Sequence, residues 1–197
     1  MAGKTILVRE AFRPVYRELN ELGKRGDKRF KRLPPQNTIA PDKVKYPLVR
    51  IFPNGDVIGI HPQLKKYLND CKVTGKRRKT GPTTVESHHL LEDRLMKHLG
   101  IHTNEGLCVA LEQVDHSYYS GELPRHLPRG DFMADIDVVY EASCEMYKAS
   151  GHPEWIPIIR HWLKSNRIKI LNHYSTTDVA GATDKDRKRV QRFFNKL

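Results

Sequence analysis

The order of apolar and turn-forming residues between positions 48 and 60 predicts a β-hairpin. Two apolar runs, Leu48–Phe52 and Val57–Ile60, flank a Pro-Asn-Gly-Asp turn sequence. Asn-Gly accepts the positive φ angles that a tight turn between two strands requires. A helix should follow from Pro62 to about Cys71, since proline is favoured in the first helical turn and two leucines recur at helical spacing, Leu64 and Leu68.

Helical periodicity recurs toward both ends of the chain. Residues 14–22 predict a short helix near the N-terminus. In the second half, we expect a long helix from an Asp131 N-cap to about Ser150 and another from Trp155 to Lys164. A basic helix over 184–197 would dock through three apolar side chains, Val190, Phe193 and Phe194. The aromatic residues of these helices are expected in the core.

The central stretch, residues 83–126, combines strand-like and helical segments with several histidines. A β-branched segment leads to the adjacent pair His88 and His89, and a compact insert with helical character follows. A second apolar run, Leu107–Leu111, predicts another strand. His116 then enters a helix, which the glycine and proline that follow should soon end.

These elements predict an α+β protein in three parts. A basic N-terminal region with the hairpin covers 1–80, a central core with helices covers 81–175, and a basic C-terminal helix covers 176–197. The net charge of +12 divides unevenly, because residues 1–80 carry +13, residues 81–157 carry −8 and residues 158–197 carry +7. Basic flanks could hold a polyanion such as nucleic acid, while the acidic centre would need a cation to accept phosphates. Solubility, or binding of acidic proteins, is the alternative explanation of the flanks.

The cysteines and the hydropathy exclude several classes of protein. Cys71, Cys108 and Cys144 are odd in number and never form a CxxC pair, so reduced, partly buried thiols are expected in place of disulfides or a zinc finger. No stretch reaches the run of about 18 apolar residues of a membrane helix. The first eight residues are too short an apolar segment for a secretory signal.

The central histidines suggest phosphodiester hydrolysis. This reaction needs an activated water, charge stabilisation on the phosphoryl oxygens and help for the departing oxygen. One divalent ion can supply the last two, and histidine is the natural base because its pKa lies near neutrality. Neighbouring side chains of a regular strand point to opposite faces, but at a strand end His88 could bind metal while His89 faces the water. His116 would complete the metal site.

Other candidate ligands receive a simpler interpretation. His61, directly before the helix expected from Pro62, is interpreted as a packing or capping residue. Cys108 lies inside an apolar run, where a thiol is usually inert. His98 and His102 are interpreted as surface or packing residues.

The pattern E-x-HH-L-x-x-x-R, then LG, N, an apolar strand and H, resembles the HNH or ββα-metal nucleases, and in particular the paired-histidine nuclease modules of bacterial polymorphic toxins. The resemblance covers about residues 83–165 and implies a ββα-metal core. It also implies catalytic roles for three residues: His88 as metal ligand, His89 as general base and Asn104 as the residue that fixes the loop behind the base. His116 would be a second metal ligand.

The chain departs from that pattern after His116. Many members carry another His or Asn four residues further on, where this chain has Ser120. The remaining ligand is left open between His126, the Ser120 hydroxyl and water. Glu86 could orient His88 through a hydrogen bond, although an exposed strand carboxylate is the equal alternative. Two imidazole ligands suit Zn²⁺, Ni²⁺ or Mn²⁺ as well as Mg²⁺.

The resemblance implies a metal-dependent endonuclease that cleaves DNA with low sequence specificity. Four adjacent cations, Lys76, Arg77, Arg78 and Lys79, would bind the phosphate backbone. An RNase on the same scaffold and a non-catalytic nucleic-acid-binding protein are the alternatives. By the same resemblance the chain would be the toxic effector of a bacterial competition system, acting in the cytoplasm of a target cell. It would then be delivered by a carrier and neutralised by an immunity protein, with no membrane partner.

Overall fold

A computed structural model of the chain describes residues 41–42, 44–52, 54–71, 74, 84–128, 135–175 and 183–197. Two compact units divide these residues. The first contains the described residues up to His89 together with Leu107–Tyr118, and the second contains Leu90–Gly106 and the described residues from Tyr119 onward. The helix predicted over 14–22 lies outside the described residues.

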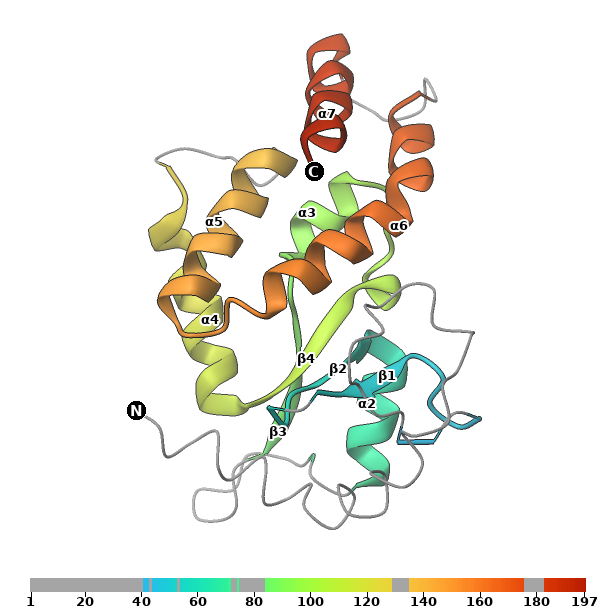
Figure 1. Cartoon of the computed structure of the whole chain (residues 1–197), viewed down its shortest axis with the longest axis vertical. Helices are drawn as coiled ribbons and strands as arrows, with labels where there is room; N and C mark the ends of the chain where they lie inside the picture. The colour runs from blue at the N-terminus through green and yellow to red at the C-terminus, as the bar shows by residue number, and fades with distance from the viewer. Residues whose placement is uncertain are drawn as a thin grey trace. The chain divides into compact units, whose positions relative to one another are not determined.

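The first unit is built on a four-stranded antiparallel sheet (Figure 1). Its strands in sheet order are β1 (Val49–Ile51), β2 (Val57–Ile60), β4 (Leu107–Glu112) and β3 (Val85–His89). The hairpin thus shares one sheet with the two central strands, across the boundary predicted at residue 80. Because β3 is an edge strand, its two histidines lie at the margin of the sheet.

The hairpin prediction is confirmed in strands and turn. Gly55 adopts φ 94°, and its N–H donates to the Phe52 carbonyl at 2.8 Å. The Asn54 side chain caps the turn, since its Nδ2 donates to the Asp56 carboxylate at 2.7 Å. A residue with a Cβ would be strained at such a φ, which explains the glycine.

One face of the sheet is covered by α2 (His61–Asp70). The predicted helix is confirmed, with Pro62 in its first turn and its leucines inward. The buried core between α2 and the sheet contains Tyr46, Val49, Ile51, Val57, Leu64, Tyr67, Leu68, Val85, Cys108 and Ala110. On β3 this is the face of Val85, Ser87 and His89, because alternate residues of a strand share a face.

The helix α4 (Gln113–His126) follows β4 directly and runs from the first unit into the second. The expected early end is wrong, since Gly121 and Pro124 both lie inside the helix. Pro124 falls in the last turn, where it removes only one backbone hydrogen bond, and the burial of Tyr119 and Leu123 holds this part of the helix in place.

The second unit is helical (Figure 1). Tyr147 donates through its hydroxyl to the Leu90 carbonyl at 3.0 Å, and its ring packs on Trp155. The tryptophans are buried as predicted. The elements of this unit besides the end of α4 are α3 (Asp93–His98), the 3-10 turn η1 (Thr103–Glu105), α5 (Ile136–Ala149), α6 (Trp155–Ser175) and α7 (Asp184–Lys196).

Two helix boundaries differ from the prediction. The N-cap of α5 is Asp135, and Asp131 lies outside the described residues. The helix α6 continues eleven residues past Lys164, to Ser175, because Ile170 and Tyr174 extend its buried face. Burial against other elements therefore indicates the ends of these helices better than backbone propensity alone.

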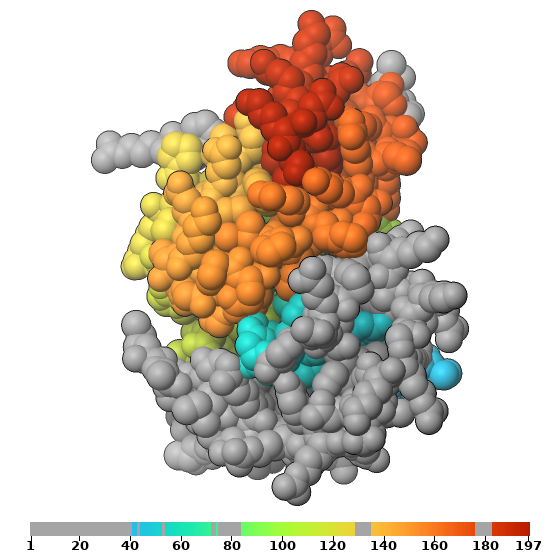
Figure 2. Space-filling view, in the orientation of Figure 1, coloured from blue at the N-terminus to red at the C-terminus, as the bar shows by residue number. Residues whose placement is uncertain are grey.

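The basic C-terminal helix α7 docks through Val190, Phe193 and Phe194, as predicted. A Thr183–Asp186 capping box begins it. Arg189 of α7 forms two ion pairs at the start of α5. Its Nη1 lies 2.7 Å from Asp135 Oδ2, and its Nε lies 2.6 Å from Asp137 Oδ1. Figure 2 shows α7, in dark red, on the surface beside α6.

The mixture of helices with a small antiparallel sheet confirms the α+β class. All three cysteines are free thiols, as expected. None of the helices in the described ranges combines the length and the apolar character that crossing a bilayer demands.

Candidate metal centre

The histidine pair lies in a regular part of β3. His88 is the Cα partner of Val109 on β4, and His89 is the partner of Cys108. Because the pairing continues through His89, the two imidazoles point to opposite faces of the sheet. We call these the His88 face, which also carries Glu86, and the His89 face, which also carries Ser87.

On the His88 face, His116 meets the histidine of β3. The ring centroids of His88 and His116 are 5.0 Å apart with planes at 85°. His116 Nδ1 lies 3.3 Å from Glu86 Oε2. His116 occupies the first turns of α4, and helical side chains lean toward the helix N-terminus, so its ring is directed back toward the sheet. The carboxylate expected to orient His88 thus contacts His116.

His88 is kept neutral by its surroundings. It is only 8% exposed, and burial together with the neighbouring His116 and His89 rings lowers its pKa to about 3. Burial is the largest cause, because a charged imidazole loses its hydration there. A neutral imidazole has the lone pair that a metal ion requires. His116 and Glu86 are more accessible, with about a third of each side chain exposed.

On the His89 face, three potential ligands converge. The rings of His61 and His89 stack with centroids 4.8 Å apart and planes at 22°. His61 Nδ1 lies 3.6 Å from Cys108 Sγ and 3.1 Å from Ser87 Oγ. One ligand atom from each of His61, His89 and Cys108 lies within 4.8 Å of the others, so this group could hold a metal ion.

This group revises the interpretation of two residues. His61 packs against His89 as a packing residue would, but it also presents a ring nitrogen to the thiol of Cys108. The two residues are 47 positions apart in the chain. They meet because β2 and β4 pair with Gly59 opposite Cys108, which brings the first residue of α2 beside β4. No local sequence pattern reports that register, so reading the sequence missed the group.

Two of the predicted site residues, Asn104 and His126, lie in the second unit. Asn104 is exposed in η1, where its backbone N–H donates to His102 Nδ1 at 3.1 Å, and its role toward His89 stays a prediction. His126 lies ten residues beyond His116, or about 15 Å along α4 at 1.5 Å per residue. His126 belongs to the second unit, and its role as a metal ligand stays a prediction. Its Nε2 lies 3.7 Å from Glu122 Oε1.

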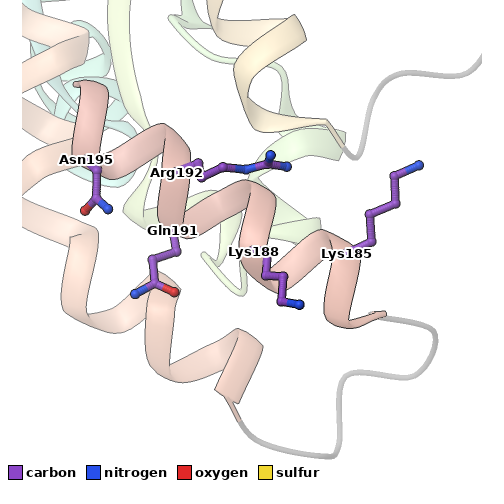
Figure 3. A pocket seen from close by; sticks show the side chains of 5 residues that line it. All are labelled: Lys185, Lys188, Gln191, Arg192 and Asn195. Atoms are coloured by element: carbon purple, nitrogen blue, oxygen red, sulfur yellow. The ribbon is translucent and has the colours of Figure 1, made fainter.

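The predicted phosphate-binding run of Lys76, Arg77, Arg78 and Lys79 lies outside the described residues. Within them, α7 carries a cationic groove (Figure 3). Its lining consists of three cations and two amides, Lys185, Lys188, Arg192, Gln191 and Asn195. Cationic and amide side chains of this kind are typical contacts for phosphate groups.

No protein-family model matches the chain, no curated protein matches its sequence, and no solved structure matches its fold. The two faces of β3 and the histidine motif that they carry are therefore the features that bear on its function.

Proposed function

We propose that the protein is a metal-dependent endonuclease whose site lies on the β3–β4–α4 segment, with His88 and His116 as metal ligands. One observation carries the proposal: the imidazoles of His88 and His116 meet beside Glu86. The strands β3 and β4 and the helix α4 that hold these residues follow the strand–strand–helix order expected of a ββα-metal core. Residues 28 positions apart come together at the edge of a sheet, where a long substrate has access.

The donor set fits a divalent ion. Two imidazoles suit Zn²⁺, Ni²⁺ and Mn²⁺ at least as well as Mg²⁺, and the Glu86 carboxylate beside them adds a negative charge that favours a cation. The buried, neutral His88 needs to release no proton on binding. Glu86, in contact with His116, would keep that ring oriented and raise its basicity as a ligand. A bound ion would neutralise charge on the scissile phosphate and on the leaving oxygen.

In this proposal His89 is the general base that takes a proton from the attacking water. Its ring lies on the face opposite His88 and His116, so the water has to reach it around the sheet margin that β3 forms. His89 follows His88 directly on the edge strand and is half-buried. Its stacking on His61 restricts the orientation of its ring. A base held in one orientation loses little entropy when it engages the water.

Nucleic acid is the proposed substrate because of the charge distribution. The central region of −8 net charge lies between chain segments of +13 and +7, and α7 adds its cationic groove. We favour DNA cleaved with low sequence specificity, since phosphate contacts carry no sequence information. RNA as the substrate is the alternative that the first experiment decides.

The test is cleavage of supercoiled plasmid and of transfer RNA, each with Mg²⁺, Mn²⁺, Ni²⁺ or Zn²⁺ and with EDTA. We expect plasmid nicking that EDTA abolishes. His88→Ala and His116→Ala should each weaken metal binding, measured by calorimetry, by at least about 100-fold, the upper end of what loss of an outer-shell partner costs. His98→Ala, on the exposed end of α3, is the matched control. If no metal supports cleavage of either nucleic acid, the proposal is wrong.

The proposed role as a toxic effector has its own test. Production of the wild-type protein inside bacterial cells should stop growth and degrade the chromosome, whereas the His89→Ala protein at equal abundance should not. Equal toxicity of the two proteins would count against a nuclease effector. An immunity protein would be a partner that restores growth by binding the wild-type chain.

A further inference from the structure

We propose that His61, His89 and Cys108 form a second metal site, selective for Zn²⁺ and similar thiophilic ions, and that its occupation switches the enzyme off by engaging His89. The existence of the site stands on the geometry of the His89 face. The inhibitory effect rests in addition on the proposed role of His89 as general base.

The backbone brings the three ligands together without rearrangement. Cys108 and His89 are direct cross-strand partners, so their side chains project from the same face of neighbouring strands. His61 enters from the first residue of α2, which covers that face. The site therefore takes one ligand from each of three elements of the first unit.

The distances match those of a tetrahedral ion. Zn–N bonds of about 2.0 Å and Zn–S bonds of about 2.3 Å hold a nitrogen and a sulfur ligand about 3.5 Å apart. His61 Nδ1 and Cys108 Sγ are 3.6 Å apart. The remaining separations are all within 4.8 Å, and they have to close by up to about 1.5 Å as the side chains rotate toward an ion. Three protein ligands leave the fourth position to water.

The donor atoms distinguish this site from the one on the His88 face. A thiolate with two imidazoles favours Zn²⁺, Co²⁺ and Cu ions and disfavours Mg²⁺, which prefers oxygen ligands. The His88 face offers a carboxylate oxygen in place of sulfur. Mg²⁺ would therefore bind only on the His88 face, whereas Zn²⁺ would bind on both.

Binding on the His89 face has a defined chemical consequence. Cys108 releases its thiol proton to solvent and donates a sulfur lone pair to the ion. One ring nitrogen of His89 donates its own lone pair to the same ion, so that nitrogen no longer accepts a proton from water. The base is lost while His88 and His116 stay in place.

The first experiment detects the site without measuring activity. Untagged, metal-free protein is titrated with Co²⁺, and the thiolate-to-cobalt charge-transfer absorption is recorded. We expect this band in the wild-type protein, its loss in Cys108→Ser, and its retention in the matched control Cys71→Ser, which removes a half-buried thiol of the same unit. His61→Ala should weaken Co²⁺ binding at this site by at least about 100-fold, on the same basis as loss of other ligand contacts.

Circular dichroism and thermal melting show whether each variant is folded. His61→Gln, which keeps a polar side chain at the start of α2, replaces His61→Ala if that variant is unstable. A wild-type protein without the band, or a band that survives Cys108→Ser, would overturn the proposed site.

The second experiment measures inhibition. Cleavage in excess Mg²⁺ is compared with and without equimolar Zn²⁺, for each protein against itself. Zn²⁺ should reduce wild-type activity by about tenfold or more and should have less than about a twofold effect on Cys108→Ser, since the thiolate provides the selectivity. Equal inhibition of the two proteins would overturn the switch. If the cobalt band is present but no metal supports cleavage, the site stands and the proposed nuclease function fails.

Discussion

The two faces of strand β3 carry adjacent histidines in opposite surroundings. On the His88 face, a buried neutral imidazole meets His116 and the carboxylate of Glu86. On the His89 face, a half-buried imidazole stacks on His61 and is the cross-strand partner of Cys108, whose thiol lies on the same face. The single strand β3 therefore supplies His88 to a group of nitrogen and oxygen donors, and His89 to a group of nitrogen and sulfur donors.

The difference shows how a two-residue sequence can serve two roles. The period of two along a strand separates neighbouring side chains onto different faces, and each face then meets a different covering element. The start of α4 supplies His116 to one face, and the start of α2 supplies His61 to the other. Substitutions on the two faces should consequently change different observables.

The largest effect is expected on the His89 face. His89→Ala should reduce plasmid cleavage by about 10²- to 10⁴-fold, the usual contribution of a general base. Mg²⁺ affinity should stay within about threefold of wild type, since the ligands on the opposite face are intact. Single-turnover cleavage and calorimetry on the same preparation measure the two quantities. A variant that nicks plasmid at the wild-type rate would show that the base is another group.

A smaller effect is expected from Glu86 on the His88 face. Glu86→Gln removes the charge that contacts His116 Nδ1 at 3.3 Å. Loss of such a partner should weaken metal binding about tenfold, near the lower end for residues that orient a ligand. Glu86→Asp keeps the charge and should restore part of the affinity. If Gln and Asp variants bind metal alike, the carboxylate does not orient His116.

A further effect, spread over several pH units, is expected on the acid stability of the metal-free protein. The pKa of His88 is lowered from 6.5 to about 3, so between these pH values the unfolded chain binds a proton at this residue that the folded chain does not. Folding stability should therefore be full above pH 6.5 and fall as the pH drops toward 3, by up to about 1.4 kcal/mol per pH unit. Urea unfolding in EDTA should show a flatter pH dependence for His88→Gln.

The reference for that measurement is His98→Gln, which removes an exposed imidazole from α3. A His88→Gln protein whose stability changes with pH as steeply as the wild type would show that His88 accepts protons in the folded state. The His88 face would then be more hydrated than its burial indicates.

Much of the fold followed from local patterns. Turn chemistry and helical periodicity act over a few residues, so a short stretch of sequence is enough to predict an element. This holds for the Asn54-Gly55 turn, the leucines of α2 and the apolar face of α7. Helix ends were predicted less well. Pro124 lies within the last turn of α4, and Ile170 and Tyr174 extend α6, since burial against other elements decides where a helix stops.

The sequence by itself determined that the protein is α+β, that adjacent histidines end a strand, and that another histidine enters a helix one strand later. Only the tertiary structure decided the neighbours of each imidazole. His61 and Cys108 meet His89 because β2, β4 and β3 pair in one register, and a slip of a single residue would turn each side chain to the other face. Long-range strand pairing, which no local pattern encodes, thus sets the chemistry of both faces.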